Sequence, residues 1–294
     1  MPRLSLNVPA SAFARPITPA WHSGVFAARF TRLMRFSQLA VRHLGRYGVY
    51  FVWLAIASLI ALTQSGQVLA QDYAREKRIA AEILPTILVG DPVWIKAKSG
   101  NEFLALYAKG DPKKRAVVLV HSVGQHPDAQ IIGLLRQHLN ELGHTTLSIQ
   151  MPIQSREAKL EDYYPTVFGD AKDRMVQSLQ WLAQQGIDKP ALLSHTMGSW
   201  MVNEMLDDRH QRNEWFAWIC MSLTGSYSWT TRSYALPILD VYAQNDIAVV
   251  VNSALRRRTA LLSTGSRQLM VSGAEASYAG HDRALAAEVS AFLR

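Results

Sequence analysis

The most constraining feature of this sequence is the ten-residue stretch Ala191-Leu-Leu-Ser-His-Thr-Met-Gly-Ser-Trp200. An apolar run leads into a short turn, and a segment of helical composition follows. This order predicts a buried strand, a sharp turn and a helix, the arrangement in which a nucleophile elbow presents its reactive side chain. The usual elbow pattern is Gly-x-Ser-x-Gly. Here Ser194 replaces the first glycine, Thr196 stands at the serine position, and Gly198 keeps the last glycine.

Strand and helix patterns alternate along residues 72–294. Continuous apolar runs predict strands buried on both faces, and apolar residues spaced three or four apart predict amphipathic helices. The turn at 98–101 predicts an antiparallel hairpin. We therefore expect one α/β domain over residues 71–294, with a mostly parallel sheet, an N-terminal antiparallel hairpin and helices on both faces. The expected strands are 91–97, 102–108, 116–121, 145–149, 191–195, 216–223, 237–243 and 268–271, and the expected helices are 72–84, 128–142, 170–185, 197–207, 250–262 and 282–293.

Residues 1–70 have the composition of an N-terminal extension with a targeting segment. They contain seven arginines and no acidic residue, and residues 49–62 form an apolar run broken only by Ser58. Such a run fits the core of a signal peptide, which spans about 7–15 residues, better than a membrane span of about 20. Val68-Leu-Ala70 then resembles a cleavage site. We expect export to the periplasm or a similar compartment, with membrane anchoring through residues 49–62 as the alternative.

The charge of the chain is concentrated in this N-terminal segment. The net charge is +8, but removing the seven arginines from the 31 basic residues leaves 24, against 23 acidic residues. A nearly neutral body gives no basis for nucleic-acid binding. The cluster Arg256-Arg-Arg258 is interpreted as a solvated helix face. Cys220 is the only cysteine, which excludes an intrachain disulfide and Cys-based zinc sites.

Three residues with catalytic potential follow predicted strands. Ligands of such sheets bind beyond the carboxyl ends of the strands, where Thr196, Asp246 and His281 are expected. Their order along the chain is nucleophile, acid and histidine. Backbone N–H groups of Met197 and Val123 would form an oxyanion hole. The structural alternatives are a helix N-cap for Thr196, a turn residue for Asp246 and a helix-flanking residue for His281.

At this point the body resembles the α/β-hydrolase superfamily. The resemblance rests on four segments and covers most of residues 90–294. Within that superfamily the chain is similar to an uncharacterised bacterial family of exported α/β-hydrolase-like proteins. The resemblance implies no cofactor and no metal, and it does not imply a serine at the elbow. The segments are Val118-Leu-Val-His-Ser-Val-Gly124, Ser194-His-Thr-Met-Gly198, Ile238-Leu-Asp-Val-Tyr-Ala-Gln-Asn-Asp246 and Gly280-His281.

Thr196 is the departure from the superfamily pattern. A β-branched residue at positive φ is strained, and its methyl group restricts the direction of the hydroxyl. A threonine at the nucleophile position is compatible with two functions. One is an exported hydrolase of a small-molecule carboxylic ester or related acyl bond, using a Thr196–His281–Asp246 triad. The other is a catalytically inactive protein of the same fold that binds a ligand or partner in the bacterial envelope.

Several further residues are weighed as structural or functional. His121 is expected to support the loop below the oxyanion site. Asp240 is the rival acid, but it falls inside a predicted strand and is expected to be either a sheet-edge carboxylate or a buried carboxylate with a partner. His126 and Asp128 have a loose metal-like spacing with His121, but the set lacks a clear third ligand. Ser122 is a minor candidate nucleophile. Aromatic residues of the two longest loops are candidates for an apolar pocket wall. They are Tyr163, Tyr164, Phe168, Tyr227 and Trp229.

Overall fold

The computed structural model describes residues 71–164, 166–228, 236–261 and 265–294. The predicted targeting segment and Trp229 lie outside the described residues, so signal cleavage and anchoring stay predictions. Within the described residues, no helix combines the length and the apolar character needed to cross a bilayer.

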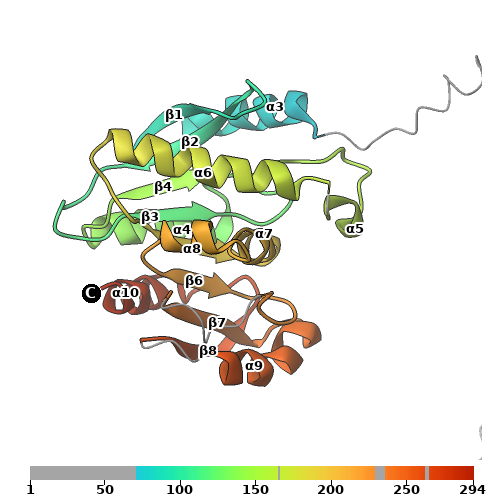
Figure 1. Ribbon diagram of the computed structural model, residues 1–294, viewed down its shortest axis with the longest axis vertical. Coiled ribbons are helices and arrows are strands. Elements are labelled where there is room, and N and C mark those ends of the chain that lie inside the picture. Colours follow the sequence, from blue (N-terminus) through green and yellow to red (C-terminus); the bar gives the residue numbers. More distant parts are fainter. Residues whose placement is uncertain (1–70, 165, 229–235, 262–264) are drawn as a thin grey trace, which may run out of the picture. The chain divides into compact units, whose positions relative to one another are not determined.

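The core element is an eight-stranded sheet in the order β1-β2-β4-β3-β5-β6-β7-β8 (Figure 1). The pairs β1–β2 and β2–β4 are antiparallel, and the remaining neighbours are parallel. This confirms the predicted mostly parallel sheet with an antiparallel start. The strands are β1 (Asp91–Lys96), β2 (Glu102–Ala108), β3 (Val117–Val120), β4 (Thr146–Ile149), β5 (Ala191–His195), β6 (Trp218–Met221), β7 (Ile238–Asn245) and β8 (Arg267–Glu275).

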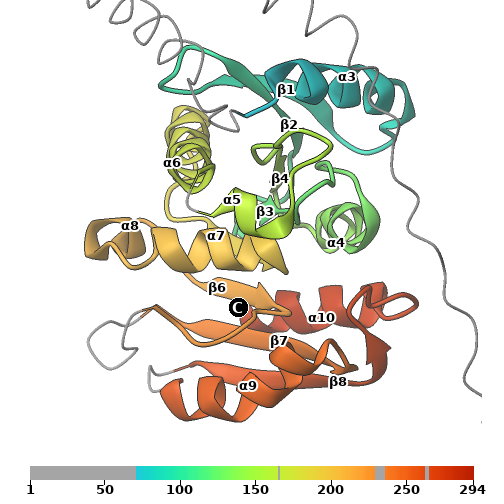
Figure 2. The same ribbon diagram turned by 90° about the vertical axis from the view of Figure 1, so that its right-hand side faces the viewer.

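Helices cover both faces of the sheet. Figure 2 shows α6 and α7 on one face, with α4 and α10 on the other. The helical elements are α3 (Tyr73–Ile83), the 3-10 turn η1 (Leu84–Thr86), α4 (Gln130–Glu141), α5 (Leu160–Tyr163), α6 (Phe168–Gln184), α7 (Met197–Met205), α8 (Arg209–Asn213), α9 (Ala248–Ala260) and α10 (Asp282–Phe292).

Strand β3 shows how the sheet divides the apolar core. Successive side chains of a strand point to opposite faces. Val118 and Val120 belong to the apolar cluster that includes residues of α6 and α7. Val117 and Leu119 belong to the cluster with residues of α4 and α10. All four are fully buried, which is why this strand is a continuous apolar run in the sequence.

Three details of the predicted elements are wrong. The helix predicted from residue 128 begins at Gln130 without a side-chain cap, and the Asp128 carboxylate pairs with the buried Arg136. The short helices α5 and α8 were not predicted. Strand β8 extends beyond its predicted end at Val271 and ends at Glu275. In this added part, the N–H of Gly273 donates a hydrogen bond to the side chain of Gln244.

The predicted solvated arginine face is also wrong at its central residue. Arg256 and Arg258 are exposed, but Arg257 is fully buried. Its Nε lies 3.0 Å from a carboxylate oxygen of Asp240 on β7, which is itself fully buried. The prediction of a buried and partnered Asp240 is therefore confirmed.

Candidate active site

The turn between β5 and α7 holds Thr196 in a strained backbone conformation. Its φ is 49° and its ψ is −115°, a combination that non-glycine residues rarely adopt. The Thr196 N–H donates to the carbonyl of Met221 at 2.9 Å, which fixes the turn to the end of β6. The Oγ1 atom is shielded from solvent and has no hydrogen-bond partner among the described residues.

The small residues around this turn have separate structural reasons. A Cβ atom on Gly198 would lie 2.6 Å from the carbonyl oxygen of His121, so α7 can approach the end of β3 only with glycine here. Ser194 is buried and its Oγ accepts a hydrogen bond from Trp218 Nε1 at 2.8 Å. It also lies 3.0 Å from Ser199 Oγ, which donates to the Met221 carbonyl. The hydroxyl at position 194 is thus fully used in fixing the turn.

The predicted oxyanion donors come from two segments of the chain, the start of α7 and the loop after β3. Met197 is the first residue of α7, and Val123 is half-buried in the loop after β3. In the part of the chain that the structure describes, neither backbone N–H donates to a backbone oxygen. Two uncommitted N–H groups near a helix N-terminus are suitable donors to an anionic oxygen. Their assignment as an oxyanion hole stays a prediction.

Asp246 directly follows β7 and is half-buried. Its Oδ2 accepts a hydrogen bond from Ser222 Oγ at 2.5 Å, and its Oδ1 accepts from the Ile247 N–H at 2.9 Å. Ser222 also lies 2.8 Å from the hydroxyl of Tyr278. The sequence analysis did not identify Ser222 or Tyr278. Ser222 falls within a strand that was predicted from its apolar residues. Tyr278 lies in the loop before His281, and no sequence pattern marks it.

His281 is half-buried at the N-terminus of α10, and its ring makes no capping hydrogen bond to that helix. The parallel order β5-β6-β7-β8 brings the segments after these strands to one edge of the sheet. Thr196, Asp246 and His281 follow β5, β7 and β8. No hydrogen bond among the described residues joins the three side chains, so the triad stays a prediction.

Two other histidines lie next to the site and are engaged structurally. Burial lowers the pKa of His121 to about 3. Its Nε2 accepts from the Met151 N–H at 2.9 Å, and its Nδ1 lies 2.7 Å from the Ser122 carbonyl. Burial also lowers the pKa of His195, although the Ala276 carbonyl and Asp246 act in the opposite direction. Both rings are therefore neutral, and His121 supports the loop as expected.

The loose metal-like set does not converge on one point. His126 Nδ1 accepts from the backbone N–H of Asp128, and the Asp128 carboxylate binds Arg136. Both nitrogens of His121 are occupied. Within the described residues, no group of three or more histidine, cysteine or acidic side chains is placed to hold a metal ion.

Two of the aromatic residues predicted to wall a pocket pack against Trp200, and the pocket itself stays a prediction. The Tyr164 ring stacks on Trp200 of α7 at 5.2 Å between ring centroids, and Phe168 meets Trp200 edge-on at 5.4 Å. Tyr164 remains 44% exposed. Tyr163 and Tyr227 are buried and do not form an open wall. The aromatic group thus lies one turn of α7 beyond Thr196.

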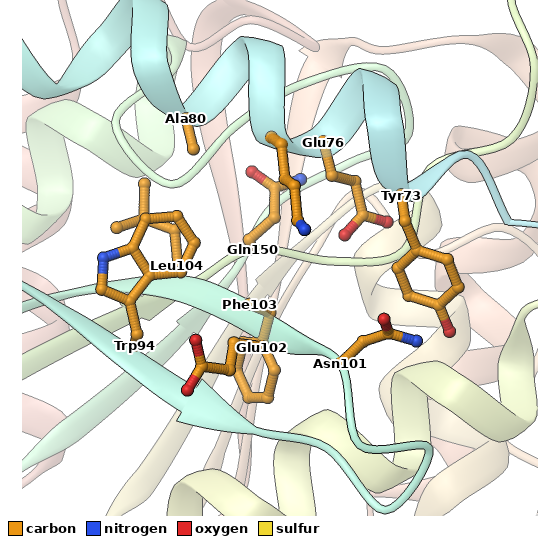
Figure 3. A pocket seen from close by; sticks show the side chains of 10 residues that line it. Tyr73, Glu76, Ala80, Trp94, Asn101, Glu102, Phe103, Leu104 and Gln150 are labelled. Atoms are coloured by element: carbon orange, nitrogen blue, oxygen red, sulfur yellow. The ribbon is translucent and has the colours of Figure 1, made fainter.

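A separate hollow lies between α3 and the β1–β2 hairpin (Figure 3). Glu76 and Gln150 lie in its centre, with Trp94 and Tyr73 toward its ends. The Glu76 carboxylate pairs with Arg174 at 2.8 Å and accepts from the Ile153 N–H at 3.0 Å. Glu76 therefore fastens α3 to the rest of the domain, and the lining shares no residue with the candidate active site.

The sheet order, the helices on both faces and the strained turn after β5 define an α/β-hydrolase fold. Residues 63–168 match the sequence model of the family described as "Protein of unknown function (DUF3530)". The fold is therefore that of the α/β-hydrolases, as predicted, and residues 63–168 resemble a family whose function is unknown. No curated protein matches the chain.

Several solved structures are similar to this chain in fold. An α/β serine hydrolase homologue from Coxiella burnetii is 14% identical, with a TM-score of 0.56 over 71% of this chain and 99% of that one. Dienelactone hydrolase from Anabaena variabilis is 16% identical, with a TM-score of 0.54 over 69% and 98%. Est1E from Butyrivibrio proteoclasticus is 15% identical, with a TM-score of 0.51 over 68% and 96%. At these identities the likeness establishes the fold alone.

Proposed function

We propose that this protein is an exported hydrolase of a carboxylic ester or related acyl bond, with Thr196 as its nucleophile. The observation that carries the proposal is the strained Thr196 with an unpartnered hydroxyl. Strain of this kind costs about 1–3 kcal/mol. Helix capping does not account for it, because the Thr196 side chain makes no capping hydrogen bond to α7. A hydroxyl that is strained and unused is expected where a substrate carbonyl has to be attacked.

The proposed reaction assigns one role to each group. Thr196 Oγ1 attacks the acyl carbon and its proton passes to His281, while the Met197 and Val123 N–H groups stabilise the oxyanion. The C–O bond to the leaving alcohol breaks, and His281 returns the proton to that alcohol. Water then hydrolyses the acyl-threonine by the same route. Asp246 orients the imidazole. Catalytic hydrogen bonds of free enzymes are often long and tighten when substrate binds.

A second candidate is a catalytically inactive protein that binds a ligand or partner in the bacterial envelope. Two observations favour it. Ser222 already donates to one oxygen of Asp246, and the Thr196 hydroxyl is shielded from solvent with no hydrogen-bond partner among the described residues. Both candidates share the proposed export, for which the composition of residues 1–70 is the support.

Labelling with a fluorophosphonate probe separates the two candidates. The full chain would be tested as wild type, Thr196→Ser and Thr196→Ala, with the labelled residue identified by mass spectrometry. Removing the β-methyl relieves strain and frees the hydroxyl direction, so we expect Thr196→Ser to label at least about tenfold faster than wild type, equivalent to about 1.4 kcal/mol. Thr196→Ala should not label.

Ser122 provides the matched control, because it is the alternative nucleophile that the sequence suggests. Ser122→Ala in the Thr196→Ser background should label as fast as Thr196→Ser alone. Labelling that survives Thr196→Ala but is lost with Ser122→Ala would contradict the assignment of the nucleophile. No labelling of any variant would leave the binding protein as the function that the site supports.

A further inference from the structure

Ser222 is the centre of a buried hydrogen-bond cluster at the edge of the sheet. It directly follows β6, is 1% exposed, and has a φ of 52°. Its hydroxyl lies 2.5 Å from Asp246 Oδ2 and 2.8 Å from the Tyr278 hydroxyl. The acceptor is a carboxylate, so the serine donates to Asp246 and accepts from the tyrosine. A hydrogen bond to a carboxylate is among the stronger hydrogen bonds of proteins.

This cluster links the three segments that carry the proposed triad. Met221, the residue before Ser222, accepts the backbone N–H of Thr196 at 2.9 Å. Tyr278 accepts the backbone N–H of His281 at 3.0 Å through its own carbonyl. Ser222 therefore lies between the nucleophile turn, the acid and the histidine loop. A displacement of its side chain would therefore affect the nucleophile turn, the acid and the histidine loop.

Two residues of the cluster share the positive φ of the nucleophile turn. Thr196, Ser222 and Tyr278 have φ values of 49°, 52° and 52°. Each strained residue costs about 1–3 kcal/mol and persists only where its surroundings hold it. In the described part of the chain the only other non-glycine residues at positive φ are Gln130 and Lys189, which lie outside this cluster. The strain is thus concentrated where the three segments meet.

The cluster also determines how the Asp246 carboxylate is presented. Oδ2 accepts from Ser222 and, at 3.5 Å, from the Ala243 N–H. Oδ1 accepts only the Ile247 N–H among the described residues. A carboxylate oxygen can accept two hydrogen bonds, so Oδ1 retains one position for an imidazole N–H. Ser222 therefore fixes which oxygen is left for His281.

We propose that Ser222 and Tyr278 are positioning residues that orient Asp246 toward His281. This inference rests on the proposed function. Tyr278 holds the Ser222 hydroxyl, Ser222 holds Oδ2, and Oδ1 is left to accept from the imidazole. Neither residue touches the substrate. Both act on the reaction only through Asp246.

The test is a double-mutant cycle on the labelling of Thr196→Ser in the full chain. The maximal labelling rate (kinact) and the probe concentration for half of that rate (KI) would be measured for Ser222→Ala, Asp246→Asn and their combination. Ser222→Ala should lower kinact about tenfold with KI unchanged, because a hydrogen bond to a charged group is lost. If Ser222 acts through Asp246, the double variant should be within about twofold of Asp246→Asn alone.

Tyr278→Phe is the second variant, since it removes one hydroxyl and keeps the buried ring that packs edge-on against His195. It should lower kinact in the same direction as Ser222→Ala and should not add to it. Ser178→Ala is the control, because Ser178 is also a buried serine but donates to a helix carbonyl of α6. That variant should label normally, and circular dichroism would verify folding of every variant.

The outcomes separate this inference from the proposed function. Additive effects of Ser222→Ala and Asp246→Asn, or an unchanged kinact in both Ser222→Ala and Tyr278→Phe, would overturn the inference while the labelled Thr196→Ser still supported the hydrolase. An unlabelled Thr196→Ser would overturn the proposed function, and with it any role of Ser222 in the reaction.

Discussion

Arg257 differs completely from its two neighbours in a run of three arginines. It is fully buried on α9, and its guanidinium also donates to the carbonyl of Leu223 at 2.8 Å and to Ser253 Oγ at 2.7 Å. Its partner Asp240 accepts a further hydrogen bond from Gln268 at 2.7 Å. Both members of the buried pair are therefore also hydrogen-bonded to neighbouring polar groups.

We predict that Arg257→Met lowers the free energy of unfolding by about 3–5 kcal/mol, because it leaves the Asp240 carboxylate buried without a countercharge. Arg256→Met, on the exposed side of the same helix turn, should change it by about 0.5 kcal/mol or less. Urea denaturation of both variants measures the difference. Equal small effects would show that the buried pair contributes nothing that an apolar side chain cannot replace.

The close approach of α7 to β3 depends on Gly198. A Cβ atom there would lie 2.6 Å from the His121 carbonyl oxygen and 2.8 Å from that of Val120, both backbone atoms that cannot turn aside. We predict that Gly198→Ala displaces α7 and lowers the free energy of unfolding by about 1–3 kcal/mol.

The control is Gly169→Ala in α6, where an added Cβ atom meets no atom within 4 Å. Alanine is favoured over glycine inside a helix by about 0.5–1 kcal/mol, so this variant should be neutral or slightly more stable. Urea denaturation compares the two substitutions directly. An unchanged stability of Gly198→Ala would mean that the helix can shift without loss of packing.

The sequence predicts an element well where all its residues are buried. It does not predict contacts between side chains that are far apart along the chain. The residues of β3 and β5 are all buried, so their apolar runs give the strands directly. The start of α4 was misplaced because Asp128 binds Arg136, eight residues away, and not the helix N-terminus. Likewise, topology places Asp246 at the correct edge, but no pattern predicts that Ser222 holds its carboxylate.

Burial of neutral histidines makes the free energy of unfolding depend on pH. Burial lowers the pKa values of His121, His144 and His195, to about 3 for His121. An unfolded histidine titrates near pH 6.5. Between these values the unfolded chain binds more protons than the folded one, so stability is complete above about pH 6.5 and falls as the pH is lowered.

We predict that the free energy of unfolding falls between pH 6.5 and pH 4.5, and that His121→Gln makes this fall shallower. One buried histidine that stays neutral contributes up to about 1.4 kcal/mol per pH unit. Glutamine can accept the Met151 N–H but does not titrate, so the variant should lose stability at pH 7 and lose less of it on acidification. His210→Gln is the control, because His210 is exposed on α8. Urea denaturation at several pH values gives both slopes. A slope equal to that of the wild type would mean that His121 takes up its proton over the same pH range in the folded and unfolded chains, which would contradict its burial as a neutral ring.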